Sequence, residues 1–203
     1  STLCVYPVYD VETSAQNGDT VELAIQNPST DVTVSGGAAV APTSPIELSG
    51  TTEATGAIVT QVHYHWRNDD GTESSATSRT GGVENTTLND LPRSTPVRLR
   101  MGVRNNGSTS TISSTLRLEY GVANPTCSGI GVWTDVGASP DAWDMFDSSQ
   151  LVHGADTLDI ATSTGGVSNF SGTTFVVDNN GVRDTDSETV SLSIDTGDFV
   201  EYE

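Results

Sequence analysis

The two cysteines are the residues with the clearest chemistry in this chain of 203 residues. Cys4 lies in an apolar N-terminal stretch, and Cys127 lies in a loop-like segment at 124–129. Two cysteines in a chain of this composition favour a single disulfide if the protein is extracellular. The bond could close within one chain or join one molecule to the next, and the residues alone leave both pairings open.

A second group of candidate site residues surrounds the glycine turn at 178–186. Carboxylate and amide oxygens are the ligands that Ca²⁺ prefers, and this short stretch is rich in both. The final bidentate acid of a calcium loop is missing there, with Glu188 the nearest substitute. The alternative is a hydrated hairpin turn built on Asn and Asp. We predict no other cofactor, and the candidate calcium ligands are Asp178, Asn180, Asp184 and Asp186.

Two histidines alternate with two aromatic residues in a segment that is expected to be a strand. Because successive side chains of a strand point to opposite faces, His63 and His65 share one face and Tyr64 and Trp66 share the other. A zinc site needs three or four ligands, so His153 or an acid would have to complete it. The favoured interpretation is a polar strand face opposite an aromatic face that packs in the core.

Two features connect the chain with carbohydrate. Trp133 and Trp143 lie in irregular sequence, where they could stack on sugar rings or pack in the core. Three Asn-X-Ser/Thr sequons begin at Asn85, Asn106 and Asn169, which makes these asparagines glycosylation candidates. A chain so rich in Ser and Thr also produces such sequons by chance.

Charge and motif content exclude several functions. The net charge is −19 and every basic residue is Arg, so nucleic acid and anionic membranes are poor partners. No run of about 18 apolar residues exists that could span a membrane. The sequence lacks a Gly-X-Ser-X-Gly, a His-Glu-X-X-His and a phosphate-binding loop, and its acids form no recognisable catalytic pair. We therefore expect a secreted protein that is not an enzyme, with Ser1 interpreted as the product of signal removal.

The elements that position these residues read as short strands. Apolar and polar residues alternate in many segments, separated by turns rich in Gly, Asn, Asp and Pro. This pattern predicts an all-β fold, an immunoglobulin-like or jelly-roll antiparallel β-sandwich. One short helical turn is expected within 141–152. The predicted strands are 20–26, 31–35, 59–67, 95–104, 110–122, 173–178, 188–194 and 198–202.

The two ends of the chain predict its domain organisation. Residues 1–14 are interpreted as an extended strand and its connector, and residues 15–203 as the β-sandwich, with a candidate seam near 124–125. The N-terminal strand is apolar on both faces, so we expect both of its faces to be buried. The strand at 198–202 is expected to have one uncovered edge, and such edges recruit partners. One face of the N-terminal strand holds Leu3, Val5 and Tyr9, and the other holds Tyr6 and Val8.

Residues 63–203 resemble repeat domains of large bacterial surface proteins. The matching segments are 64–73, 96–100, 116–121, 126–128 and 132–136. In that pattern a further strand follows the last one and carries a cysteine among apolar residues. The N-terminal segment 2–8 is similar to that strand, which implies that it completes the sheet of a neighbouring molecule. The resemblance further implies a cell-surface setting.

Together these features predict the structural subunit of an extracellular, pilus-like filament. The assembly resembles donor-strand complementation, in which each subunit lends a strand to the next, with identical subunits as partners. Cys4 of one subunit would then bond Cys127 of its neighbour. The alternative is a monomeric cell-surface adhesin or a carbohydrate-binding β-sandwich module that contacts surface glycans.

Overall fold

The computed structural model describes residues 18–22, 24–33, 36, 39–41, 43–47, 50, 52–53, 55–109, 111, 113–137 and 142–203. The chain divides into two compact units, residues 1–56 and 57–203, which are described separately below. Cys4 and the predicted donor strand lie outside the described residues. The predicted boundary at 14/15 also lies outside them, and the seam near 124–125 stays a prediction.

The first unit contains two small antiparallel strand pairs and one helical turn. β1 (Thr20–Val21) pairs with β4 (Thr52–Glu53), and β2 (Ala24–Ile25) pairs with β3 (Ile46–Glu47). The helix α1 covers Pro28–Asp31.

The helix α1 differs from the prediction of a strand at 31–35. Pro28 at the start of α1 has its φ angle already fixed near the helical value. The Asp31 carboxylate accepts a hydrogen bond from the Asn27 backbone N–H at 2.9 Å, which closes the first turn. The prediction is therefore wrong at Asp31, because local capping outweighs the short alternating pattern.

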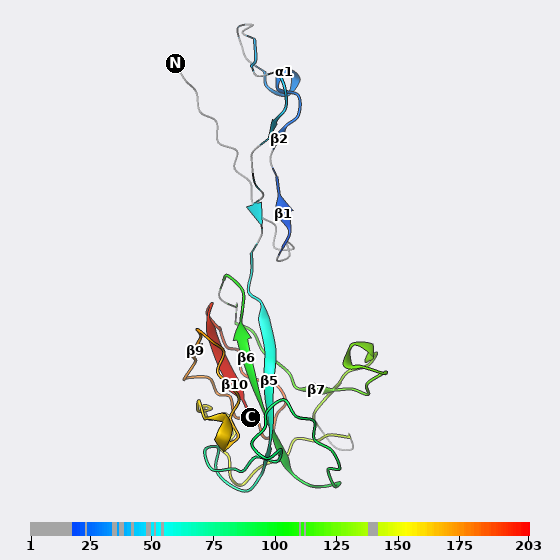
Figure 1. Cartoon of the computed structure of the whole chain (residues 1–203), viewed down its shortest axis with the longest axis vertical. Coiled ribbons are helices and arrows are strands. Elements are labelled where there is room, and N and C mark those ends of the chain that lie inside the picture. The colour runs from blue at the N-terminus through cyan, green and yellow to red at the C-terminus, as the bar shows by residue number, and fades with distance from the viewer. Residues whose placement is uncertain are drawn as a thin grey trace. The chain divides into compact units, whose positions relative to one another are not determined.

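The second unit is built on a four-stranded sheet in the order β5-β6-β10-β9 (Figure 1). β5 (Val59–Asn68) is antiparallel to β6 (Val97–Asn105), and β6 is antiparallel to β10 (Asp198–Tyr202). β9 (Thr174–Phe175) is parallel to β10. The three long strands confirm the alternation at 59–67, 95–104 and 198–202, and the all-β class is confirmed with them.

A less regular layer of chain covers part of this sheet. Segments 111–118 and 187–194 pair antiparallel through backbone bonds such as Thr111 N–H to Ile194 O at 3.0 Å. The strand β7 (Glu119–Tyr120) continues the first segment and pairs with β8 (Thr134–Asp135). The core lies where this layer meets the sheet and comprises Val103, Ile194, Val200 and Tyr202, with Leu116, Val176 and Leu192 against them.

Several predicted elements are shorter in the structure than the alternation suggested. In the described part of 110–122, isolated bridges join Ser114 to Leu192 and Arg117 to Glu188, and β7 follows them. Only two residues of 173–178 form a strand. The part of 141–152 that the structure describes contains turns and no helix. Short 3₁₀ helices lie instead at η1 (Cys127–Gly129) and η2 (Thr162–Thr164). Among the described residues, no helix has the length and apolar character that crossing a bilayer requires.

The C-terminal strand β10 lies inside the sheet, which differs from the expectation of an uncovered edge. On one side it pairs with β6, and on the other it pairs first with β9 (Figure 1). Beyond β9, Thr157 Oγ1 donates to the carbonyl of Glu201 at 2.6 Å, and the Arg183 N–H donates to the carbonyl of Glu203 at 2.7 Å. The edge of β10 that was expected to be uncovered is therefore occupied by the chain's own segments.

Candidate functional site

The most unusual feature of the second unit is the burial of a charged sheet face. His65, Arg67, Arg100 and Glu201 are each 0% exposed, and all four project from the same face of β5, β6 and β10. On the opposite face Tyr64 is only partly buried. The histidine face is thus polar, as expected, but it is the buried face, and the expectation that the aromatic face opposite forms the core is wrong at Tyr64 and Trp66.

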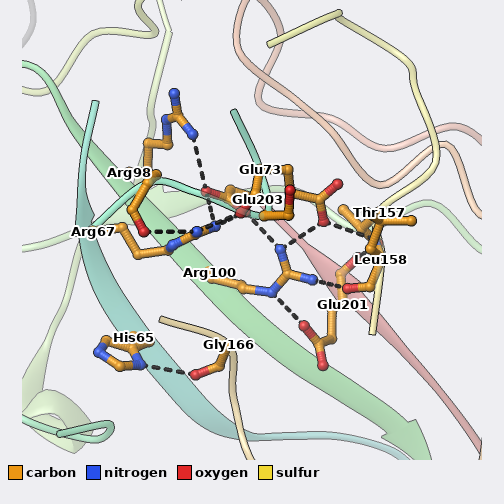
Figure 2. Close-up of polar contacts among 12 residues, drawn as sticks. His65, Arg67, Glu73, Arg98, Arg100, Thr157, Leu158, Gly166, Glu201 and Glu203 are labelled. Carbon is orange, nitrogen blue, oxygen red and sulfur yellow. Dashed lines mark hydrogen bonds and ion pairs between the residues drawn. The ribbon is translucent and has the colours of Figure 1, made fainter. Parts of the chain in front are cut away.

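Glu203 lies at the centre of this buried network (Figure 2). Arg67 Nη1 donates to both carboxylate oxygens of Glu203 at 2.6 Å, and Arg100 Nη1 donates to Oε2 at 2.6 Å. Arg98 Nη1 lies 3.6 Å from Glu203 Oε1. Three guanidinium groups from two strands thus converge on one carboxylate.

Arg100 extends the network to the chain that covers the face (Figure 2). Its Nε donates to Glu201 Oε2, its Nη1 donates to Glu73 Oε1 at 2.7 Å, and its Nη2 donates to the Leu158 carbonyl. Glu73 Oε1 also accepts the backbone N–H of Leu158 at 2.7 Å. One arginine therefore links β6, β10, the turn at Glu73 and the segment at Leu158.

Hydrogen bonds and ion pairs of Arg67 and Arg98 also connect the sheet with the turns that follow β5. Arg98 Nε and Nη2 donate to Asp69 Oδ1 at 2.8 and 2.5 Å, and Arg98 Nη2 donates to the carbonyl of Gly71 at 2.6 Å. Arg67 Nη2 donates to the carbonyl of Ala76 at 3.1 Å. Buried guanidinium groups need such partners, because an unpaired buried charge is strongly destabilising.

Burial shifts the pKa values of these groups in different directions. Desolvation lowers the pKa of Arg67, although Glu203 attracts its charge. For Arg100, attraction to Glu201 and Glu203 outweighs the desolvation that opposes it, so its pKa is raised. Burial raises the pKa of Glu201 to about 7 even though Arg100 opposes this shift. Glu201 Oε1 has no hydrogen-bond partner among the described residues, so little offsets the effect of burial on this carboxylate.

His65 connects the network with two loops. One ring nitrogen, Nδ1, lies 2.8 Å from the Gly166 carbonyl (Figure 2), and the other, Nε2, lies 2.7 Å from Ser78 Oγ. Since both nitrogens have partners, the buried ring is held by protein groups on both sides. The arrangement pins loops against β5, and it offers no open position for a metal ion.

The sequence contained a signal for this network that motif analysis missed. Arg98 and Arg100 are two residues apart, as are Glu201 and Glu203, so each pair lies on one face of its strand. Opposite charges repeated with the strand period on two strands indicate a paired ionic face. The signal becomes specific only when the two strands are known to be neighbours.

Of the two predicted cysteine partners, the structure describes Cys127. Cys127 is a free and exposed cysteine in η1, and the loop carrying it lies apart from the four-stranded sheet (Figure 1). Apolar side chains flank it in the chain, with Val122 86%, Val132 75% and Trp133 51% exposed. Its predicted partner Cys4 and the donor residues Leu3, Val5, Tyr6, Val8 and Tyr9 lie outside the described residues.

The predicted calcium ligands lie near one another in sequence, but two of their carboxylates have other partners. Asp184 Oδ1 lies 3.0 Å from His153 Nδ1, and Asp186 Oδ2 lies 3.3 Å from Arg183 Nη2. Asp178 and Asn180 are exposed. Within the part of the chain that the structure describes, no group of three or more His, Cys, Asp and Glu side chains could hold a metal ion. Calcium binding stays a prediction.

The histidines proposed for a metal are separated in the structure. His63 Nδ1 lies 3.7 Å from Glu84 Oε2, and its ring stacks at a tilt on Phe170 with centroids 5.2 Å apart. His65 points into the buried network, and His153 pairs with Asp184. The structure thus brings no two of these imidazoles to one ligand position.

The predicted carbohydrate-related residues all reach the surface. Asn85, Asn106 and Asn169 are exposed, although Asn169 Nδ2 donates to Asp159 Oδ2 at 2.9 Å. Trp143 is 40% exposed and stacks on Trp66 with ring centroids 6.2 Å apart. Access alone therefore permits glycan attachment at these asparagines and glycan contact at Trp143.

No family model, no curated protein and no solved structure matches this chain. Its function is therefore inferred from its own residues and their geometry.

Proposed function

We propose that this protein is the structural subunit of an extracellular filament. Identical subunits join head to tail, and the N-terminal strand of one subunit completes the β-sandwich of the next. The observation that carries the proposal is the exposed, free thiol of Cys127 on a loop with exposed apolar side chains. The chain's other thiol, Cys4, lies in the apolar segment that needs burial on both faces.

The chemistry of the link is disulfide formation between subunits. The thiols of Cys4 and Cys127 lose two protons and two electrons, and their sulfurs form one bond. The electrons pass to an oxidant of the extracellular or periplasmic compartment, such as molecular oxygen or a thiol–disulfide oxidoreductase. A covalent bond at each joint keeps the N-terminal strand from leaving the neighbouring subunit under shear.

The buried ionic network supports a structural role. It joins β5, β6 and β10 to the segments at Glu73 and Leu158 through the buried side chain of Arg100 and the largely buried side chain of Glu73. A buried network whose charged groups pair across several strands favours one arrangement of the strands over slipped alternatives. A domain held this way suits a subunit that is pulled along a fibre.

Two single-cysteine variants test the proposal. Cys4→Ser retains only Cys127, and Cys127→Ser retains only Cys4. We expect the wild-type protein to run as a ladder on non-reducing gels and as one band after reduction. A mixture of the two variants should give disulfide-linked dimers and nothing longer, because each chain keeps one half of the joint.

The double variant that lacks both cysteines is the matched control, and it should give no linked species. Electron microscopy of the wild-type protein should show filaments. The proposal is wrong if the wild-type protein is a monomer whose Cys4 and Cys127 are bonded within one chain, as peptide mapping would reveal.

A second candidate function is carbohydrate binding, which the exposure of Trp133 and Trp143 favours. Exposed aromatic rings are the groups that stack on sugars. Binding to a glycan array that disappears in Trp143→Ala, by a protein that remains monomeric, would support this candidate in place of the filament.

A further inference from the structure

One apolar sheet face is covered at one end and left partly exposed at the other. Tyr64 lies opposite Met101, and Trp66 lies opposite Leu99, so these four side chains project from one face of β5 and β6. All four are only partly buried. We call them the apolar patch.

The apolar patch continues into the core. Met101 lies opposite Tyr202 of β10, and that end of the face is buried by the layer that contains Leu116, Leu192 and Ile194. Over β5, the ring of Trp143 stacks on the ring of Trp66, and Trp143 is itself 40% exposed. The covering layer thus buries Val103, Val200 and Tyr202 and leaves the apolar patch only partly covered.

We propose that the apolar patch accepts the segment 3–9 of a second copy of this chain. This inference rests on the proposed function and names the surface that receives the donor strand. The apolar patch, and not the edge of β10, is then the receiving surface, because the chain's own segments already occupy that edge.

The chemistry of the segment 3–9 fits this surface. An extended strand of that length presents Leu3, Val5 and Tyr9 on one face, so three apolar side chains reach the same side. Residues 1–9 contain no acidic side chain, whereas the whole chain has a net charge of −19. The acidic surface of a second copy therefore does not repel this uncharged segment.

The position of Cys127 agrees with the same occupant. The Tyr120 hydroxyl accepts the backbone N–H of Ala142 at 3.2 Å, which holds β7 beside the residue that precedes Trp143. Cys127 follows Tyr120 by seven residues, a reach of at most about 25 Å. The segment 3–9 spans about 20 Å when extended, so a strand on the apolar patch can place Cys4 within reach of that loop.

Photocrosslinking of the full chain tests this inference. A benzoylphenylalanine replaces Tyr6 in one variant and Tyr9 in another, because the two residues report on opposite faces of the strand. Equal amounts of ¹⁴N- and ¹⁵N-labelled protein are mixed, assembled, irradiated and mapped by mass spectrometry. We expect one of the two variants to crosslink to 64–66 or 99–101 of the differently labelled chain. The same photoreactive group at Val177, which is 66% exposed, should not label these residues.

The possible outcomes separate this inference from the proposed function. Crosslinks between chains that map elsewhere on 57–203 overturn the apolar patch and leave the filament intact. Crosslinks that stay within one isotopic label show that the chain's own segment covers the patch. If no polymer and no crosslink between chains forms, the proposed function fails as well. Glycan binding lost in Trp66→Ala, with crosslinks elsewhere, would assign the patch to sugar.

A charge placed on the patch gives a second readout. Leu99→Arg should abolish the disulfide ladder of the wild-type protein, because a guanidinium group there opposes burial under an apolar strand. Val177→Arg adds the same charge at an exposed site and should keep the ladder. Circular dichroism establishes that both variants are folded. An unchanged ladder in a folded Leu99→Arg variant would overturn the inference.

Discussion

Glu201 is a buried acid whose two oxygens have unequal surroundings. Its Oε2 accepts from Arg100, whereas Oε1 has no partner among the described residues. Burial removes the carboxylate from water and leaves the charge on Oε1 without a compensating hydrogen bond, so burial raises the pKa of Glu201 to about 7. This side chain therefore couples the stability of the sheet to pH.

Because the folded pKa of Glu201 lies above its ordinary value of 4.5, the folded state binds the proton more tightly than the unfolded state. The contribution of Glu201 to the free energy of unfolding should fall as pH rises from about 4.5 to about 7 and stay constant above. The fall is roughly 3 kcal/mol, at about 1.4 kcal/mol per pKa unit.

Urea unfolding of the wild-type protein and Glu201→Gln at several pH values measures this contribution as a difference. The exposed Glu119→Gln variant is a matched control for the loss of one carboxylate. Parallel curves for wild type and Glu201→Gln between pH 4.5 and 7 would contradict the assignment.

The loop at 160–166 is held in place by a close approach of its own backbone, at Gly166. A Cβ atom on Gly166 would lie 1.8 Å from the carbonyl oxygen of Ile160, so the backbone can close there only without a side chain. The same residue presents its carbonyl to His65 at 2.8 Å. The loop therefore covers the buried face only if this close approach is kept.

Gly166→Ala is expected to lower the free energy of unfolding by about 1–3 kcal/mol, the usual cost of overpacking. Gly131→Ala is the matched control, because an added Cβ there meets no atom within 4 Å. Guanidinium denaturation at constant pH measures both variants. Equal midpoints for the two would show that the loop shifts freely and does not hold His65.

At the level of the whole chain, assembly should depend on the apolar character of the N-terminal segment and not only on its thiol. A variant with Ser in place of Leu3, Val5, Tyr6, Val8 and Tyr9 keeps Cys4 and the backbone of the donor strand. We expect it to lose long polymers, because the side chains that seek burial are gone. Removal of residues 1–11 should have the same effect and leave a folded monomer of lower stability.

Light scattering after gel filtration measures the polymer length of both variants, and circular dichroism measures their folding. The Cys4→Ser variant is the matched control, since it keeps the apolar side chains and loses only the covalent link. Its assemblies should form but dissociate in detergent. Long polymers in the five-serine variant would show that the apolar segment has no role in assembly.

The period-two alternation was sufficient to predict the all-β class and the long strands. The alternation continues through ten residues of β5 (Val59–Asn68), nine of β6 (Val97–Asn105) and five of β10 (Asp198–Tyr202). The shorter elements were harder to predict, because segments such as 188–194 are held by single bridges and side-chain contacts with distant residues. The exposure of Cys127 likewise required the structure.

Alternation separates the two faces of a strand but does not identify the face that is buried. Tyr64 and Trp66 have the more apolar side chains, yet their neighbours Arg67 and His65 are the fully buried ones. The reason is electrostatic: burying guanidinium groups is tolerable only when carboxylates neutralise them. Those carboxylates, at Glu73, Glu201 and Glu203, come from segments that are distant in sequence, so only the tertiary structure could decide which face lies inside.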